Sequence, residues 1–249
     1  MKNIKLTIEY DGSHYAGWQK QKNGPSIQQT LEKAVLQLTG ETVIVNGSGR
    51  TDAKVHAYGQ TASFKTLSSI PPDSFYKALN QKLPDDIKCV ASCEVEDSFH
   101  ARFSATGKHY RYIILNRNVK PAISRNYSGF YKERLDTQAM GLAIKEFEGE
   151  HDFRGFMSTG SDVKNTFRTI YETSVNVDGD FIILDFKGNG FLYNMVRIIV
   201  GTLIDVGLGK INANDIKDII LSKDRKRAGK TAKASGLYLM AVYYDKKIT

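Results

Sequence analysis

Asp52 is the one carboxylate in a short stretch of the chain that is otherwise rich in cations. Arg50, Lys54 and His56 all lie within four residues of it. Cations at this spacing favour the ionised carboxyl group, through Coulomb attraction and charge-assisted hydrogen bonds. An ionised, positioned carboxylate has the chemistry of a nucleophile or a general base. The alternative is structural, because a loop aspartate paired to an arginine for local order has perturbed ionisation as well.

Cations alternate with aromatic side chains between residues 99 and 112. Arg102, Lys108 and Arg111 are the cations of this stretch. Such a pattern is suited to holding phosphates and stacking bases at the same time. In an extended strand, Tyr110 and Tyr112 share one face while Arg111 points away. The alternative is an ordinary strand with one aromatic face in the core.

Two further features are basic. Arg197 lies within an apolar stretch, where burying its guanidinium would require an anionic partner; alternatively, its charged end reaches solvent from the edge of a helix. Residues 223–233 form a run of cations, which as a bare pattern is typical of a solvated segment. The run ends like a nucleotide-binding loop, but Asp224 stands where that loop requires its first glycine. We therefore exclude a nucleoside-triphosphate site.

The sequence lacks the motifs that are typical of several classes of enzyme. There is no nucleophile elbow and no His-Glu-x-x-His helix, and the five histidines lack metal-ligand spacing. Cys89 and Cys93 have no partner pair at zinc-finger spacing, so we expect reduced thiols. No signal peptide or membrane span is visible. We expect a cytoplasmic protein without a metal site.

Composition agrees with a globular chain that has a polyanionic partner. Hydrophobic residues make up 41% of the 249 residues and charged residues 25%, which is enough apolar material for a real core. The formal net charge of +8 suits a nucleic acid, although charge alone is weak support.

The hydrophobic pattern predicts an α+β fold with two similar halves, each with a mainly antiparallel sheet and helices on one face. We expect domains at 1–105 and 106–249. The expected strands are 4–10, 43–45, 59–64, 87–96, 110–116, 169–177, 181–187 and 236–244. The expected helices are one that opens at Pro25-Ser26 and stops at Gly40, and others at 75–83, 137–147, 192–206 and 212–221.

Residues 49–57, Gly-Arg-Thr-Asp-Ala-Lys-Val-His-Ala, resemble the signature loop of the TruA family of tRNA pseudouridine synthases. That family commonly has glycine at the position of Lys54. If that position has a positive φ, lysine is strained there. The segments around Tyr110, Arg197 and Leu237 resemble further motifs of the family in the same order, so the resemblance covers essentially the whole chain.

The resemblance implies isomerisation of uridine to pseudouridine at positions 38, 39 and 40 of the tRNA anticodon stem-loop. It implies a homodimer with one tRNA lying across both subunits, a central basic cleft formed by the two halves of the chain, and no cofactor or metal. Asp52 would be the nucleophile or base, assisted by Arg50, with Arg197 paired to it. Tyr110 would stack on the target uracil, with Leu237 near the base pocket. The remaining expected RNA contacts are Lys54, His56, Arg102, Lys108, Arg111, Arg168, Arg225, Arg227 and Lys230.

Two questions stay open at this level: the atom at which Asp52 acts, and the class of protein. Attack at C1′, attack at C6 and proton abstraction from C2′ are all compatible with the residues. A non-catalytic RNA-binding module and a metal-dependent enzyme acting on another polyanion are the rival classes.

Overall fold

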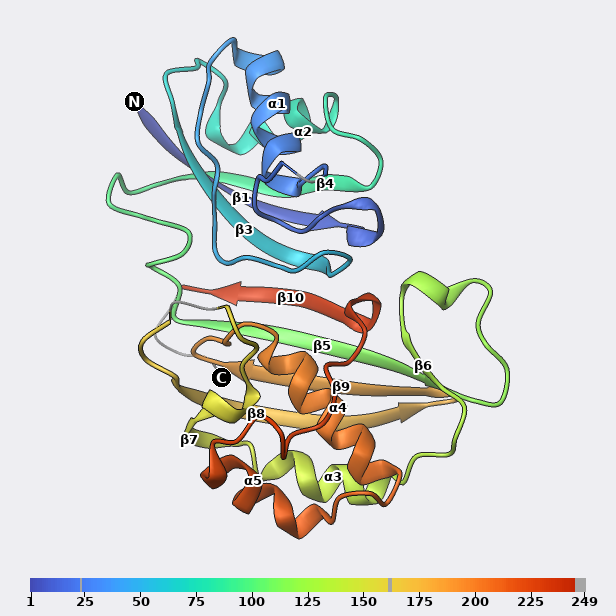
Figure 1. Cartoon of the computed structure of the whole chain (residues 1–249). Coiled ribbons are helices and arrows are strands. Elements are labelled where there is room, and N and C mark those ends of the chain that lie inside the picture. The colour runs from blue at the N-terminus through green and yellow to red at the C-terminus, as the bar shows by residue number, and fades with distance from the viewer. Residues whose placement is uncertain (23, 161–162, 245–249) are drawn as a thin grey trace. The chain divides into compact units, whose positions relative to one another are not determined.

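The chain folds as two compact units in a computed structural model that describes residues 1–22, 24–160 and 163–244. Unit 1 comprises Met1–Thr106 and the C-terminal segment from Tyr238; unit 2 comprises Gly107–Leu237 (Figure 1). The expected domains, 1–105 and 106–249, stay a prediction; the two compact units divide after Thr106, and the last described strand, from Tyr238 onward, belongs to unit 1. That strand pairs in parallel with a strand of unit 1, a long-range contact that local sequence patterns do not reveal.

Unit 1 contributes four long strands to a ten-stranded sheet and has two α-helices. The strand order is β4-β1-β3-β10, with β1 antiparallel to β3 and β4, and β10 parallel to β3. A two-residue strand, β2, also pairs with β3. The elements are β1 (Lys2–Tyr10), α1 (Ile27–Thr39), β2 (Asn46–Gly47), β3 (His56–Thr66), α2 (Phe75–Asn80), β4 (Ile87–Val95) and β10 (Leu237–Tyr243).

Sequence alternation and helix capping explain unit 1 well. Ile4, Leu6 and Ile8 of β1 are fully buried, as a half-buried strand requires. The hydroxyl of Ser26 accepts a hydrogen bond from Gln29 N–H at the start of α1, and Gly40 ends the helix with φ 76°. The expected start and end of this helix are confirmed.

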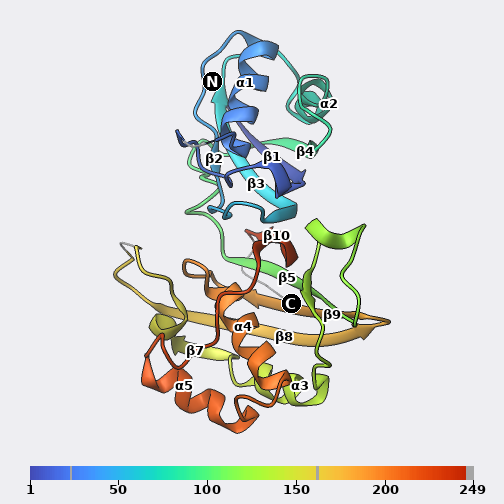
Figure 2. The ribbon, with the colours of Figure 1, turned by 45° about the vertical axis from the view of Figure 1, so that its right-hand side comes forward.

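Unit 2 contributes mainly antiparallel strands to the sheet, with helices packed against them. Its strand order is β5-β9-β8-β7, and β6 pairs in parallel with β5 (Figure 2). The elements are β5 (Gly107–Asn116), β6 (Gly129–Tyr131), α3 (Thr137–Lys145), β7 (Gly149–Asp152), β8 (Phe167–Asp178), β9 (Phe181–Gly188), α4 (Met195–Gly207) and α5 (Ile216–Ser222).

The expected α+β class, with mostly antiparallel sheets, is confirmed. The expected strand at 43–45 is wrong, because pairing with β3 begins only at Asn46 and Gly47. Strands β6 and β7 were not expected, since each is too short to carry a periodic pattern. No helix in the described parts of the chain has the length and apolar character needed to cross a membrane.

Candidate active site

The loop that carries Asp52 is fixed on its N-terminal side by a buried glutamine. Ser48 Oγ donates to Gln60 Oε1 at 2.5 Å, and Gln60 Nε2 donates to the carbonyl oxygen of Gly49 at 3.1 Å. Gln60 belongs to β3 and is completely buried. Because a buried amide that lost these partners would be costly, the three residues hold one another in place.

A second anchor lies immediately before the carboxylate. Tyr10 Oη and Thr51 Oγ1 are 2.7 Å apart in the interior, and Trp18 N–H donates to the carbonyl oxygen of Thr51 at 3.0 Å. Burial raises the pKa of Tyr10 well above its usual value, so its hydroxyl stays protonated at neutral pH. The residue next to Asp52 is thus tied to both strand β1 and the segment that follows it.

Glycines of the N-terminal segment complete the support. A Cβ on Gly12 would overlap the carbonyl oxygen of Val55, and one on Gly17 would lie 2.5 Å from that of Thr51. Gly17 also has φ 104°. Backbone at these two places packs directly against the Asp52 loop, which only glycine permits. The sequence analysis missed Tyr10 and Gln60, because their partners Thr51 and Gly49 lie far from them in the sequence.

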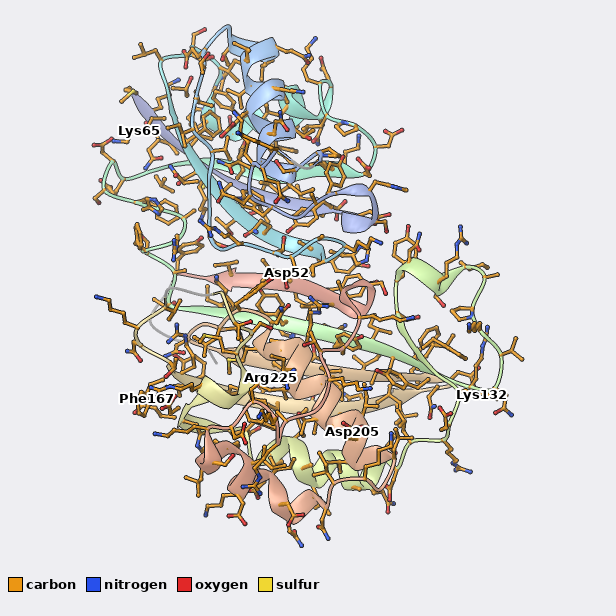
Figure 3. The ribbon with its side chains drawn as sticks, viewed as in Figure 1. Asp52, Lys65, Lys132, Phe167, Asp205 and Arg225 are labelled. Carbon is orange, nitrogen blue, oxygen red and sulfur yellow. The ribbon has the colours of Figure 1, made fainter. Side chains whose placement is uncertain are left out.

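Asp52 itself is half-buried and begins a turn (Figure 3). Its carbonyl oxygen accepts a hydrogen bond from Val55 N–H at 3.2 Å. Lys54 has φ 65°, so the lysine does occupy a left-handed position, and its N–H donates to the carbonyl oxygen of Tyr15 at 3.3 Å. Arg50 and Lys54 are both exposed. The loop therefore presents two cations to solvent beside a positioned carboxylate.

His56 behaves differently from its neighbours. Its side chain is buried, with 2% of the residue exposed, and its ring stacks on Tyr238 at 4.9 Å. Gly12 N–H donates to Nδ1 at 3.2 Å, and Asp11 Oδ1 lies 3.1 Å from the same nitrogen. These contacts hold the His56 ring in the interior of unit 1.

In unit 2, strand β5 separates its aromatic and charged side chains as expected. Tyr110 and Tyr112 are buried; the ring of Tyr110 meets Phe191 edge-on at 5.2 Å. Arg111 forms a bidentate pair with Asp185, with Nε–Oδ1 at 2.9 Å and Nη2–Oδ2 at 3.1 Å. His109 Nε2 lies 2.6 Å from the same carboxylate. Arg111 is therefore engaged within its own sheet.

Arg197 is held at the N-terminal end of α4. Its Nε donates to the carbonyl oxygen of Ala232 at 2.8 Å, and Nη1 donates to Asn194 Oδ1 at 2.7 Å. Asn194 precedes the helix with φ 60°. Both contacts are with neutral oxygens, and they fix the direction of a half-buried guanidinium.

The basic run 223–233 is packed against α4 at its glycine. Gly229 N–H donates to Thr202 Oγ1 at 2.8 Å, and a Cβ on Gly201 would overlap the carbonyl oxygen of Lys230. Arg225 Nη1 donates to the carbonyl oxygens of Ala228 and Gly229, at 3.2 and 2.9 Å. Arg225 thus shapes its own loop, whereas Lys226, Arg227 and Lys230 are exposed.

The other expected contacts are spread over both units. In unit 1, the exposed guanidinium of Arg102 lies 5.5 Å from the ring centroid of Phe103. In unit 2, Lys108 is half-buried at the start of β5, and Arg168 Nη1 donates to the carbonyl oxygens of Asn165 and Phe167. Leu237 is buried at the start of β10.

The site residues therefore fall into two groups. Asp52, Arg50 and Lys54 belong to unit 1, whereas Tyr110 and Arg197 belong to unit 2. Within residues 1–22, 24–160 and 163–244, no group of three His, Cys, Asp or Glu side chains is arranged to hold a metal ion.

Comparison with known proteins identifies the class. The model of the tRNA pseudouridine synthase family matches residues 6–104 and 143–245, which include Asp52, Arg197 and Leu237. The chain belongs to the tRNA pseudouridine synthase family, a family of isomerases.

Individual relatives are similar over the whole length. A tRNA pseudouridine synthase A from Acetivibrio thermocellus is 52% identical over 244 residues, covering 98% of this chain and 100% of the relative. Enzymes of the same name from Ruminiclostridium cellulolyticum and Clostridium acetobutylicum are 52% and 51% identical, with the same coverage. Among solved structures, a chain of a Cbf5–Nop10–Gar1 complex aligns with a TM-score of 0.40 at 15% identity, over 95% of this chain and 48% of that one. That structural likeness is too low to carry an argument.

Proposed function

We propose that this chain converts uridine to pseudouridine at positions 38, 39 and 40 of the tRNA anticodon stem-loop, with Asp52 as the nucleophile or base. The observation that carries the proposal is the Asp52 loop. Its carboxylate follows Thr51, which is tied to buried Tyr10, and its N-terminal side is tied to buried Gln60. A carboxylate held in this way loses little freedom when a substrate binds, which is what a reacting group needs.

The reaction breaks the bond between N1 and C1′, rotates the uracil and forms a bond from C1′ to C5, while C5 loses its proton and N1 gains one. It has no net redox change, so the proposal includes no cofactor and no metal. The target base has to leave its stack, at a cost of a few kcal/mol. Arg50 would occupy the vacated space, and Tyr110 would stack on the extruded uracil, with Leu237 beside it.

Arg197 would pair with Asp52 and keep its carboxylate ionised. A nearby guanidinium favours the charged form of an acid, although a very tight pair would reduce its basicity. Two neutral oxygens already orient this guanidinium. Whether Asp52 then acts at C1′, C2′ or C6 stays open.

The proposed partner is tRNA, bound in a basic cleft of a homodimer in the cytoplasm, where tRNA is found. Exposed cations are the best candidates for phosphate contacts, because counterion release from phosphates dominates such binding. The exposed members of the expected set are Arg50, Lys54, Arg102, Arg227 and Lys230. The side chains of His56, Arg111 and Arg225 are held by neighbouring residues. These three would support RNA binding indirectly, by positioning the residues that contact the RNA.

The first experiment is a single-turnover assay with a full-length tRNA, comparing wild type, Asp52→Asn and Asp73→Asn. Asp73 is an exposed carboxylate of the same unit and serves as the matched control. We expect pseudouridine at positions 38 to 40 from wild type and Asp73→Asn, and none from Asp52→Asn. The affinity of Asp52→Asn for tRNA should stay within about tenfold, because phosphates dominate it.

Other outcomes would assign the chain to a rival class. Wild-type rates in Asp52→Asn would remove the carboxylate from the chemistry. Tight binding without product from any of the three proteins would indicate an RNA-binding module. Loss of wild-type activity on adding a chelator would favour a metal-dependent enzyme.

A further inference from the structure

Most of the net charge of this protein comes from one stretch of sequence. Residues 98–132 contain no Asp or Glu and seven Lys or Arg, so they contribute +7 (7 minus 0) of the formal +8. The site described above uses Arg102, Lys108 and Arg111 from this stretch. The remaining cations are Arg117, Lys120, Arg125 and Lys132.

Three of these four cations lie on the connection between β5 and β6, residues 117–128, which we call the arm. Figure 1 shows it in green as a loop that projects from the end of β5, and Lys132 follows β6 (Figure 3). Lys120 and Arg125 are exposed. Between these cations the arm exposes large apolar side chains, with 69% of Val119, 89% of Ile123 and 41% of Tyr127 accessible.

The base of the arm is fixed by one asparagine. Asn116 Nδ2 donates to the carbonyl oxygens of Tyr131 and Glu133, at 3.0 and 2.7 Å, and its Oδ1 accepts from Leu135 N–H at 3.0 Å. A single side chain thus ties the end of β5 to the chain that follows the arm. The exposed part of the arm projects from a fixed base.

A second set of contacts shapes the return of the arm to the sheet. Ser128 Oγ donates to the carbonyl oxygen of Ser124 at 3.0 Å, and Ser235 Oγ donates to that of Ser128 at 3.2 Å. A Cβ on Gly129 would lie 2.6 Å from Tyr112 Oη. A surface feature held in this way loses less entropy on binding than a free loop would.

An exposed surface of this composition fits a polyanion that also has flat apolar faces. Cations interleaved with apolar and aromatic groups contact both phosphates and bases or riboses, whereas the lack of carboxylates removes repulsion. We infer that the arm is a second tRNA-binding element, with Lys120 and Arg125 contacting phosphates and Ile123 at its tip lying against the RNA. This inference rests on the proposed function for the identity of the RNA.

The salt dependence of tRNA binding tests the cations. The double variant Lys120→Gln, Arg125→Gln should lower the slope of log affinity against log salt by about 1.4 to 1.8, which is 0.7 to 0.9 for each lost phosphate contact. The matched control is Lys82→Gln, Lys217→Gln, which removes two exposed cations elsewhere. The control should keep the wild-type slope.

Two variants at the tip of the arm test the effect of a negative charge separately from the effect of side-chain size. Ile123→Asn and Ile123→Asp place side chains of nearly equal size at the most exposed position of the arm. Ile123→Asp should bind tRNA several-fold more weakly than Ile123→Asn at low salt, and the difference should shrink as salt rises. Since the site is exposed, both variants should fold, and unfolding curves check this.

The outcomes separate this inference from the proposed function. If the Lys120→Gln, Arg125→Gln variant lowers the salt slope of tRNA binding but wild type makes no pseudouridine, the role of the arm is supported and the proposed isomerisation is wrong. Pseudouridine formation with unchanged slopes and equal affinities at residue 123 would overturn the arm and leave the isomerisation intact. A changed oligomeric state with an unchanged slope would make the arm a protein contact, which also overturns the inference, as would the absence of tRNA binding by wild type.

Discussion

At the scale of single residues, the Asp52 loop shows how the proposed reacting group is held by neighbouring residues. Tyr10, Thr51 and Gln60 make the hydrogen bonds, and two glycines allow the backbone to approach. The three basic residues that drew attention to the loop in the sequence differ in their exposure to solvent. Arg50 and Lys54 are exposed, whereas His56 is buried against Tyr238.

Lys54 gives a prediction about stability. Its φ of 65° is unfavourable for a residue with a Cβ, by about 1 to 2 kcal/mol, whereas glycine adopts it freely but loses more entropy on folding. Lys54→Gly should therefore raise the free energy of unfolding by about 0.5 to 1 kcal/mol. Urea unfolding measures this. Lys54→Ala is the control, because it removes the charge but keeps the Cβ, and an equal gain in that variant would place the cause in the charge instead of the backbone.

At the residue level, the sequence indicated the proposed reacting groups but not the residues that hold them. The carboxylate and its cations are adjacent in the chain, so their types and spacing were informative. The partners of the loop come from β1, β3 and the segment after β1, and only folding brings them together. Likewise, Asp185 lies 74 residues from Arg111, and no local pattern indicates that pair.

At the scale of elements, hydrogen-bonded ion pairs connect neighbouring strands of unit 2. Asp185 of β9 faces Arg111 of β5 in the sheet register, and His109 of the same strand contacts the same carboxylate. Burial raises the pKa of Asp185, but the hydrogen bonds from His109 and Arg111 outweigh it, so the pKa of this carboxyl lies below its usual value.

This shift predicts how stability depends on pH. Because the folded-state pKa is lower than the unfolded-state value of about 3.9, the stabilisation is complete above about pH 5 and is lost as the pH falls through the folded-state pKa. Asp185→Asn should lower the free energy of unfolding by about 1 to 3 kcal/mol at pH 7. The difference from wild type should decline below pH 4. Asp180→Asn, which removes an exposed carboxylate 3.7 Å from Arg117, should cost less than about 1 kcal/mol; equal losses in the two variants would contradict the assignment.

Helices and strands with a strong hydrophobic periodicity were predictable from the sequence. Strands that depend on hydrogen bonding to a distant strand were not. The apolar alternation of β1 and the caps of α1 are local properties. At 43–45 the alternation is present, with Val45 buried and Ile44 exposed, yet the ladder to β3 starts only at Asn46. Apolar alternation reports which side faces the core, whereas a strand also needs a neighbour for its backbone hydrogen bonds.

At the scale of the whole molecule, the proposed chemistry depends on both units, since Asp52 belongs to one and Arg197 to the other. A double-mutant cycle tests their proposed pairing. Asp52→Asn and Arg197→Gln should show a coupling free energy of about 0.5 to 3 kcal/mol in the free energy of unfolding, because the second change costs little once its partner is gone.

The control is a second double-mutant cycle, in which Arg134→Gln is used in place of Arg197→Gln. Arg134 is an exposed arginine of the same unit. Asp52→Asn and Arg134→Gln should be additive within about 0.5 kcal/mol. Additivity in the Arg197 cycle as well would mean that the two groups do not pair.

The pairing of β10 with β3 also has a consequence for how the protein is made. Unit 2 is an insertion in unit 1, because β10, the last strand of the described residues, follows unit 2 in the sequence and belongs to unit 1. During synthesis the N-terminal unit therefore cannot complete its sheet while it is the only part translated, although domains usually finish in chain order. The β3 edge, which follows directly after the Asp52 loop, has to wait for the last strand to leave the ribosome. If translation stalled before residue 237, unit 2 would be almost fully synthesised while unit 1 still lacked β10.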